Sequence, residues 1–277
     1  MKIHSLVNIK QHQNSPIGVF DSGLGGLTVL KSLENMLPNE SFIYFGDTAH
    51  VPYGTKSAEA VIKYSQNILD YFLEHNTKAV VIACNTASAV AYHVLQKNYS
   101  IPLFDVVSPS VEYACQESIT KNIGVIGTTS TVSSKAYSRQ FAEKNIHFAI
   151  HEISCPLFVP VIEEGWADTN VAREIASIYL QDFQENNIDT LILGCTHYPI
   201  MANTIQSVLS SHVRLVFSGE TVGQKLSRYL NENNLINTSS SGGHINFYVS
   251  DFPQKFDALG SRFFGRKLID VTHISFV

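Results

Sequence analysis

The chain has 277 residues, 44% of them hydrophobic, and a formal net charge of −5 from 19 Lys and Arg against 24 Asp and Glu. This length allows one large domain or two moderate ones with a substantial core. No basic cluster is present, which argues against nucleic acid as the main partner, and no apolar run approaches the ~20 residues of a membrane span. Residues 1–16 are polar and lack the apolar centre of a signal peptide, so we expect a loose N-terminal extension on a cytoplasmic protein.

Strands and helices alternate along the first half of the chain. Apolar runs predict strands at 17–20, 42–45, 80–83 and 102–107, and helices are predicted at about 27–37, 57–75 and 87–96, with another that begins at Ser108. A loop at 47–55 contains Pro52, Tyr53 and Gly54. This alternation is typical of a parallel sheet with helices on both faces.

The second half repeats the alternation. Strands are predicted at 123–127, 147–153, 190–193 and 213–217, and helices up to about 145, at about 170–186 and at 220–235. Two prolines are expected to break regular structure at 155–160, with a loop at 163–166 and a flexible connection at 237–243. Residues 245–277 offer one strand and one short helix, so they must pack onto one of the halves.

Two pairs of matching segments indicate an internal repeat. Segment 80–89 is an apolar strand that runs through a cysteine and a polar cap into a helix, and 190–199 repeats this pattern. Segment 17–22 is likewise matched by 123–128. The offsets, 195 − 84 = 111 and 123 − 17 = 106, are similar enough to indicate two halves with one topology. If the halves face each other, the two thiols lie on opposite walls of one cleft.

Cys84 is predicted at the carboxyl end of a strand and beside a helix N-terminus, where open α/β sheets bind ligands. Asn85 and Thr86 are good N-caps, and the helix N–H groups and dipole should favour the thiolate form of Cys84. Alternatively, Cys84 and Cys195 are two small buried hydrophobic side chains. A metal site formed by both cysteines and His197 is a further alternative, although closely spaced cysteine pairs are lacking.

Asp21 follows the first strand and precedes a glycine loop, so its carboxylate is expected to point into the same cleft or to cap the helix behind it. The loop, 23–26, does not match a dinucleotide-binding fingerprint, because Thr28 stands where glycine is required. His197, two residues beyond Cys195, is a candidate acid, base or orienting partner. The two remaining cysteines are expected to be structural: Cys115 and Cys155.

Six motifs resemble those of the glutamate racemases, in the cofactor-independent aspartate/glutamate racemase superfamily. They are Gly18–Gly26, Pro52–Gly54, Ala83–Ser88, Gly124–Thr128, Pro156–Pro160 and Gly194–Pro199, and the resemblance runs from about Ile17 to Phe264. It implies an α/β fold of two similar lobes, each a mainly parallel sheet flanked by helices, with the active site in the cleft between them. The first lobe would comprise 17–105 and 217–277, and the second lobe 106–216.

The resemblance also implies roles for individual residues. Cys84 and Cys195 are expected to carry protons in catalysis, with Asp21 and His197 tuning the thiols. The implied substrate contacts are Asp21, Ser22, Tyr53, Gly54, Asn85, Thr86, Thr128, Glu163, Thr196 and His197. Glu164 is an equal candidate for the family glutamate at Glu163, and the sequence leaves this choice open. His50 stands where many relatives carry Arg, and the tail before Pro16 is longer than in most of them.

The resemblance implies interconversion of L- and D-glutamate, in which one thiolate takes the α-proton and the other thiol returns a proton to the opposite face. D-Glutamate would serve bacterial peptidoglycan. These motifs contain no lysine that could form a Schiff base with pyridoxal phosphate. Neither a cofactor nor a metal is therefore expected. Three alternatives stay open: aspartate as substrate, a hydrolase with Cys84 as nucleophile and His197 as base, and a non-catalytic amino-acid-binding module. The expected binding partner is the substrate glutamate, and neither nucleic acid nor a membrane is expected as a partner. Formation of a homodimer stays open.

Overall fold

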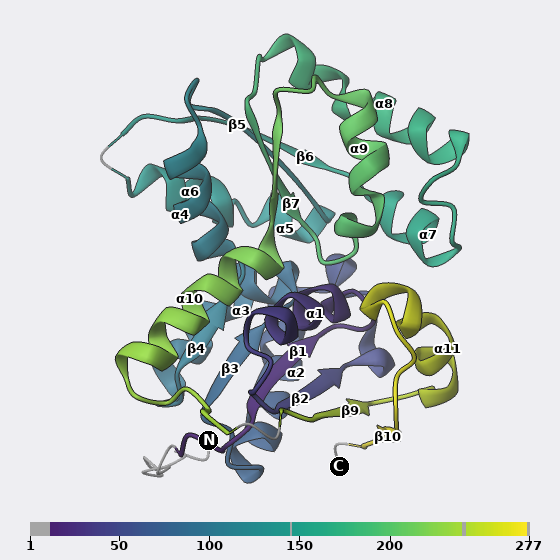
Figure 1. Ribbon diagram of the computed structural model, residues 1–277. Helices are drawn as coiled ribbons and strands as arrows, with labels where there is room; N and C mark the ends of the chain where they lie inside the picture. The colour runs from purple at the N-terminus through teal and green to yellow at the C-terminus, as the bar shows by residue number, and fades with distance from the viewer. Residues whose placement is uncertain (1–11, 145, 240–241, 276–277) are drawn as a thin grey trace.

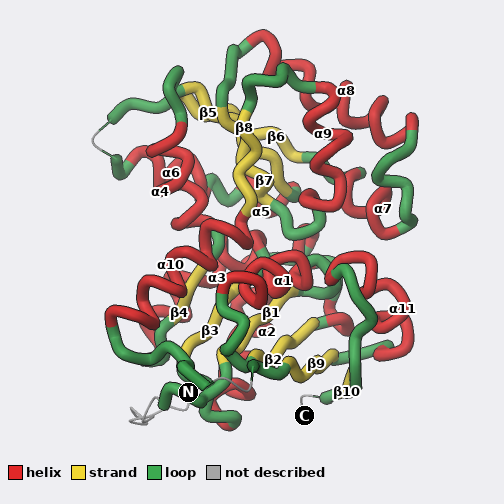
Figure 2. The backbone as a smooth tube through the Cα atoms, viewed as in Figure 1, coloured by secondary structure: helices red, strands yellow, loops and turns green. Residues whose placement is uncertain are grey.

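The computed structural model describes residues 12–144, 146–239 and 242–275, which form two α/β lobes (Figure 1). Most of the predicted N-terminal extension, 1–11, lies outside the described residues, as do 240–241 in the predicted flexible connection and 276–277 at the end of the chain. In Figure 2 the strands form two separate groups, each surrounded by helices. Within the described ranges, no helix is both long enough and apolar enough to cross a membrane.

The first lobe is built on a six-stranded sheet with the order β10-β9-β2-β1-β3-β4, in which every pairing is parallel. Its strands are β1 (Ile17–Asp21), β2 (Phe42–Gly46), β3 (Ala79–Ile82), β4 (Leu103–Asp105), β9 (Ile245–Val249) and β10 (Val271–His273). The first four of these strands are buried along their whole length, as expected of parallel strands covered on both faces. The C-terminal part of the chain therefore returns to extend the sheet at β2.

Helices cover both faces of this sheet. They are α1 (Gly26–Met36), α2 (Ala58–Glu74), α3 (Asn85–Asn98), α10 (Ser218–Glu232) and α11 (Pro253–Phe264), with two 3-10 turns, η1 (Thr48–His50) and η2 (Tyr53–Thr55), after β2. Apolar side chains of α1, α10 and α11, such as Leu30 and Leu226, share one core cluster. Those of α2 and α3, such as Phe72 and Leu95, share another. The sheet is thus the middle layer of the lobe.

The second lobe has a four-stranded parallel sheet with the order β6-β5-β7-β8. Its strands are β5 (Asn122–Gly127), β6 (Ala149–Ser154), β7 (Thr190–Gly194) and β8 (Arg214–Phe217). Its helices are α4 (Val107–Glu117), α5 (Thr129–Ser133), α6 (Ala136–Ala142), α7 (Phe158–Glu163), α8 (Asn170–Glu185) and α9 (Ala202–Val208), with the 3-10 turn η3 (Tyr198–Met201). Figure 1 shows α4 and α6 on one side of the sheet and α7, α8 and α9 on the other.

The strand orders confirm the predicted repeat. β2-β1-β3-β4 in the first lobe has the same connectivity as β6-β5-β7-β8 in the second, and β9 and β10 are additions to the first. In both sheets the order reverses beside the first strand, so the carboxyl ends of the first and third strands flank a topological switch point. Cys84 and Cys195 follow the third strand of their respective sheets. The fold therefore gives both thiols equivalent positions, while the lobe limits near 105 and 217 stay a prediction.

Three predicted segments differ in the structure. The helix expected up to about 145 is split into α5 and α6, because Lys135 between them adopts a left-handed conformation (φ 54°). The prolines are predicted to break regular structure at 155–160, but α7 begins at Phe158 and tolerates Pro160, because the first turn of a helix has unpaired N–H groups. The C-terminal segment contains a second strand, β10, that was not predicted. A strand of three residues is too short to show a recognisable apolar pattern.

Candidate active site

A cavity of about 440 Å³ lies between the two lobes, at the carboxyl ends of both sheets. Both candidate cysteines line it, together with every predicted substrate contact except Asp21. The predicted residues in its wall are Ser22, Tyr53, Gly54, Cys84, Asn85, Thr86, Thr128, Glu163, Cys195, Thr196 and His197. The two halves of the repeat thus contribute to one cavity, as the sequence predicted.

Cys84 is itself the N-cap of α3. Its Sγ accepts a hydrogen bond from the Ala87 backbone N–H at 3.5 Å, and its thiol donates to Ser22 Oγ at 3.9 Å. The prediction that Asn85 and Thr86 are the caps is therefore wrong, since Asn85 is already the first helical residue. The shift matters chemically, because it places the thiol directly in front of the unpaired N–H groups of the helix.

Burial dominates the acid–base properties of both thiols. It raises the pKa of Cys84 to about 12, with a further increase from the Asp21 carboxylate, and the hydrogen bonds from Ala87 and with Ser22 only partly offset this. Burial also raises the pKa of Cys195 well above its ordinary value. The Ala87 N–H lowers the pKa of Cys84, as expected, but the prediction that Cys84 would lose its proton more easily is wrong, because desolvation of the charged form outweighs these hydrogen bonds.

His197 connects Cys195 to Glu163. The imidazole Nδ1 lies 4.0 Å from Cys195 Sγ, and Nε2 lies 3.1 Å from Glu163 Oε1. The hydrogen bond with His197 lowers the pKa of Glu163. Glu164 also lines the cavity, but Glu163 is the one that contacts His197. The ring of Phe263, from α11 of the first lobe, packs edge-on against the imidazole, so both lobes fix its orientation.

Asp21 lies behind the cavity wall, fully buried at the end of β1. Its Oδ2 accepts the Gly23 N–H at 3.0 Å, and its Oδ1 accepts the Thr196 hydroxyl, from the other lobe, at 3.4 Å. The alternative that it caps the following helix is wrong, because Gly25 is the N-cap of α1 and no side chain caps it. Asp21 therefore orders the glycine loop and ties that loop to the Cys195 wall.

Close approach between the lobes explains glycines in two motifs. A Cβ at Gly25 would lie 2.2 Å from Thr196 Oγ1 and 2.4 Å from His197 Nδ1, and a Cβ at Gly54 would lie 2.9 Å from the Thr128 Cβ. Both distances at Gly25 are far below van der Waals contact. Glycine is required at these positions because a wall of the second lobe occupies the space of a side chain.

Polar side chains from both lobes meet at the start of α3. The Thr86 hydroxyl lies 3.0 Å from that of Thr128 and 3.1 Å from that of Thr131. The Asn85 amide donates to the Tyr137 hydroxyl at 3.0 Å and to the Ser218 hydroxyl at 3.1 Å. These hydrogen bonds join segments far apart in sequence, so they hold the two halves of the cavity together.

Tyr53 contributes to the wall, but its hydroxyl points to a partner outside the predicted set. It donates to Asp47 Oδ2 at 2.5 Å, and the same carboxylate accepts Ser250 Oγ at 2.7 Å and contacts His50 Nδ1 at 2.8 Å. Burial, followed by the Asp47 charge, raises the pKa of Tyr53. The phenol therefore stays neutral and anchors the loop after β2.

Four residues that support the site are not predicted from the sequence: Asp47, Thr131, Tyr137 and Ser218. None stands beside a cysteine in the sequence, although Thr131 follows Thr128 by one helical turn, a spacing that could have indicated a shared face. Cys155 was expected to be structural, and it is fully buried as that role requires, but it also forms part of the cavity wall. In the described residues, no group of three or more His, Cys, Asp and Glu side chains could hold a metal ion.

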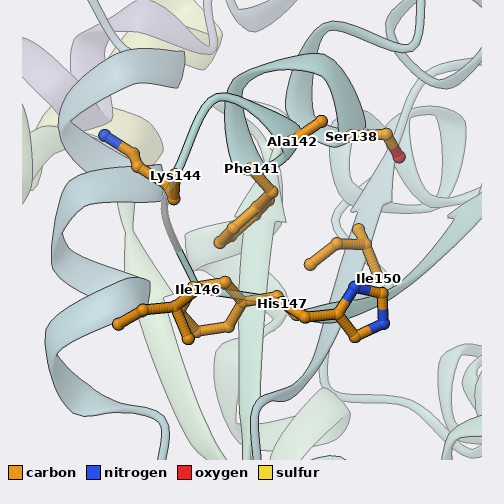
Figure 3. A pocket seen from close by; sticks show the side chains of 8 residues that line it. Ser138, Phe141, Ala142, Lys144, Ile146, His147 and Ile150 are labelled. Atoms are coloured by element: carbon orange, nitrogen blue, oxygen red, sulfur yellow. The ribbon is translucent and has the colours of Figure 1, made fainter.

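A second cavity, of about 520 Å³, lies in the second lobe (Figure 3). Its described lining residues are Ser138, Phe141, Ala142, Lys144, Ile146, His147, Phe148 and Ile150. They include no cysteine and no carboxylate, and Lys144 and His147 are its ionisable groups. Since the predicted motifs all lie elsewhere, this cavity is not assigned to the chemistry of the site.

Fold and site together define a two-lobed α/β protein whose repeated halves each present a thiol to one shared cavity. The family model described as Asp/Glu/Hydantoin racemase matches residues 17–222. The chain therefore belongs to the Asp/Glu/hydantoin racemase family. This confirms the resemblance inferred from the motifs.

Similar proteins of known name cover nearly the whole chain. A glutamate racemase of Geobacter metallireducens is 44% identical over 259 residues, which are 94% of this chain and 96% of that protein. The glutamate racemase from Francisella tularensis subsp. tularensis SCHU S4, crystallised in complex with D-glutamate, is 40% identical with a TM-score of 0.89, covering 95% of this chain and 98% of that one. The glutamate racemase from Thermus thermophilus, in complex with beta-chloro-D-alanine, is 41% identical with a TM-score of 0.87 over the same shares.

Proposed function

We propose that this chain is an amino-acid racemase that interconverts L- and D-glutamate without a cofactor. The observation that carries the proposal is the pair of thiols, Cys84 and Cys195, that line one cavity from equivalent positions in two lobes. Relatives with 40% identity or more over nearly the whole chain are named glutamate racemases. D-Glutamate made in this way would supply bacterial peptidoglycan.

The two thiols are proposed to work as an acid and a base on opposite faces of the substrate α-carbon. One, as thiolate, removes the α-proton, and the other, as thiol, donates a proton to the opposite face, which inverts the centre. For the reverse direction the roles exchange. The raised pKa of Cys84 makes its thiolate a strong base, which suits a weak carbon acid better than an ordinary thiolate would.

The cavity wall offers hydrogen-bond donors suited to the carboxylates of an amino acid. The N-terminus of α3, which has 14 residues, presents unpaired N–H groups beside Cys84, and such a terminus favours a carboxylate. Ser22, Thr86 and Thr128 add hydroxyl groups to the wall, and the Thr196 hydroxyl already donates to Asp21. The substrate ammonium would bring positive charge close to the thiols, and a nearby positive charge lowers a thiol pKa. Substrate binding is thus proposed to help generate the thiolate.

Tuning roles are proposed for His197 and Asp21. His197 lies beside Cys195 and is held by Glu163, so it is suited to move a proton to or from that thiol. Asp21 raises the pKa of Cys84 through its charge and orders the glycine loop. The hydrolase alternative required His197 as the base for Cys84, whereas the imidazole contacts Cys195. Aspartate as substrate is less well supported, because the relatives described above are glutamate racemases.

No lysine occurs among the described residues that line the cavity, so no side-chain amine is available there for a Schiff base. We propose that the enzyme acts in the cytoplasm on the free amino acid, without nucleic acid or membrane, as a monomer or a homodimer.

The test is incubation of the purified protein with L-glutamate and, separately, with D-glutamate in heavy water, followed by chiral analysis and mass spectrometry. Early product should carry deuterium at the α-carbon while the remaining substrate stays protiated, because the returned proton comes from a different thiol. A glutamate binder that leaves both enantiomers unchanged would contradict the proposal. Equal early deuterium in substrate and product would contradict the two-thiol scheme while leaving racemisation intact.

A further inference from the structure

We propose that Thr28, on helix α1 of the first lobe, is a positioning residue that holds the Cys195 segment of the second lobe in the shared cavity. This inference rests on the proposed function, since Cys195 is one of the two proposed proton carriers. Thr28 does not line the cavity and is not among the predicted substrate contacts. It acts instead through the backbone of Thr196, the residue that follows Cys195.

A proline leaves one carbonyl of this segment without its expected donor. After Cys195 the chain turns with hydrogen bonds between residues three apart, and the Tyr198 N–H donates to the Cys195 carbonyl at 3.1 Å. The next carbonyl, that of Thr196, would accept from residue 199 in the same way, but Pro199 has no N–H. Thr196 is 5% exposed, so its carbonyl needs a donor from elsewhere in the protein.

The Thr28 hydroxyl supplies that donor from the other lobe. Its Oγ1 lies 2.8 Å from the Thr196 carbonyl oxygen and 2.9 Å from the Gly25 carbonyl oxygen. The Gly25 carbonyl already accepts the Thr28 backbone N–H at 3.0 Å, so it does not depend on the hydroxyl. A hydroxyl has one proton to donate, and we assign it to the Thr196 carbonyl. This hydrogen bond joins residues 168 positions apart in the sequence and spans the two lobes.

Other first-lobe groups hold the side chains of the same segment. The Thr196 hydroxyl donates to Asp21 Oδ1 at 3.4 Å. The His197 ring packs edge-on against Phe263, with the ring centroids 5.2 Å apart. Thr28 differs from both because it holds the main chain. The main chain at Thr196 sets the direction of the preceding cysteine side chain, and therefore the position of its Sγ in the cavity.

The expected consequence differs between the two thiols. Cys84 makes its hydrogen bonds with Ser22 and the Ala87 N–H, within the first lobe. Loss of the Thr28 hydroxyl should therefore slow proton transfer to and from Cys195 and leave transfer at Cys84 nearly unchanged. For the enantiomer whose α-proton Cys195 removes, breaking of the Cα–H bond then limits the rate more than in wild type. For the other enantiomer, Cys84 removes the proton, and the later donation by Cys195 limits the rate.

The experiment measures kcat/KM for L- and D-glutamate, each with hydrogen or deuterium at the α-carbon, in wild type, Thr28→Val and Thr28→Ser. Valine keeps the branched shape without the hydroxyl, whereas serine keeps the hydroxyl. Loss of the donor to a buried carbonyl should lower kcat/KM about tenfold in Thr28→Val, and equally for both enantiomers. The α-deuterium isotope effect should rise for one enantiomer and fall for the other. Thr28→Ser should remain close to wild type in rate and in both isotope effects.

Thr204→Val is the matched control, because the Thr204 hydroxyl donates to the Ala167 carbonyl at 2.7 Å within the second lobe and outside the cavity. It should lower thermal stability as Thr28→Val does, but leave kcat/KM and both isotope effects unchanged. Should Thr28→Val fail to fold, Thr28→Ala lacks the same hydroxyl and takes its place. Wild-type kcat/KM in Thr28→Val, or a loss with both isotope effects unchanged, would overturn the inference, as would an equal loss in Thr28→Ser. Failure of the wild type to racemise glutamate would instead overturn the proposed function.

Discussion

Gly25→Ala tests whether close packing between the lobes positions the Cys195 wall. The backbone at Gly25 has φ −58° and ψ −37°, which alanine adopts without strain, so the effect comes from the added Cβ alone. That atom would lie 2.2 Å from Thr196 Oγ1, whereas ordinary contact begins near 3.4 Å, so the wall must move by about 1 Å. A misplacement of about 1 Å costs about a hundredfold in rate. We therefore expect kcat/KM to fall about a hundredfold.

The assay is racemisation of both glutamate enantiomers by chiral analysis, with thermal unfolding measured in parallel. Overpacking of this kind destabilises a protein by about 1–3 kcal/mol, so the variant should remain folded at room temperature. Gly223→Ala, on α10 outside the cavity, is the control. Its Cβ would press on the thioether of Met36, a flexible side chain 37% exposed, and would meet Leu33 at an ordinary 3.6 Å. A folded Gly25→Ala enzyme with wild-type kcat/KM would refute the argument that this contact positions the wall.

Three other predictions address the thiols and the core. Asp21→Asn removes a negative charge that raises the pKa of Cys84, so the thiolate should form at lower pH. Iodoacetamide should then alkylate Cys84 about threefold faster per unit of pKa at neutral pH, because the gain in thiolate outweighs its lower nucleophilicity, and unchanged rates would contradict this. Replacing either proposed catalytic cysteine by Ala should slow racemisation by about a hundredfold to ten-thousandfold, whereas Cys115→Ala, outside the cavity, should not, as chiral analysis would show. Lys78→Met should leave the buried Glu40 carboxylate without its cation and lower the free energy of unfolding in urea by about 3–5 kcal/mol, and adding Glu40→Leu should restore most of it.

The repeated lobes could be predicted from the sequence because each strand end carries a strong local signal. An apolar β-branched run such as Val80–Ile82 needs no partner to be recognised as a buried strand. The polar residues that follow it mark the switch point, where the topology brings distant strand ends together. The α/β class, the two similar halves and the shared cavity all follow from these local signals.

The supporting contacts could not be predicted, because they depend on distances across the fold. Tyr137 reaches Asn85 from 52 residues away and Ser218 reaches it from 133, and neither residue has a local pattern that indicates a partner. The pKa of Cys84 was mispredicted for a related reason. Its helix N–H donor is a local feature, whereas the degree of burial that outweighs it is a property of the assembled lobes.

The two proposed proton carriers have unlike neighbours, and this asymmetry has a thermodynamic limit. Cys84 contacts Ser22 and a helix N–H, whereas Cys195 contacts an imidazole held by a carboxylate. L- and D-glutamate are mirror images with equal free energy in water, so the Haldane relation requires equal kcat/KM in both directions. The unlike neighbours can therefore make kcat differ between the two enantiomers only if KM differs between them by the same factor. The enzyme can hold one enantiomer more tightly, but it can never favour one at equilibrium.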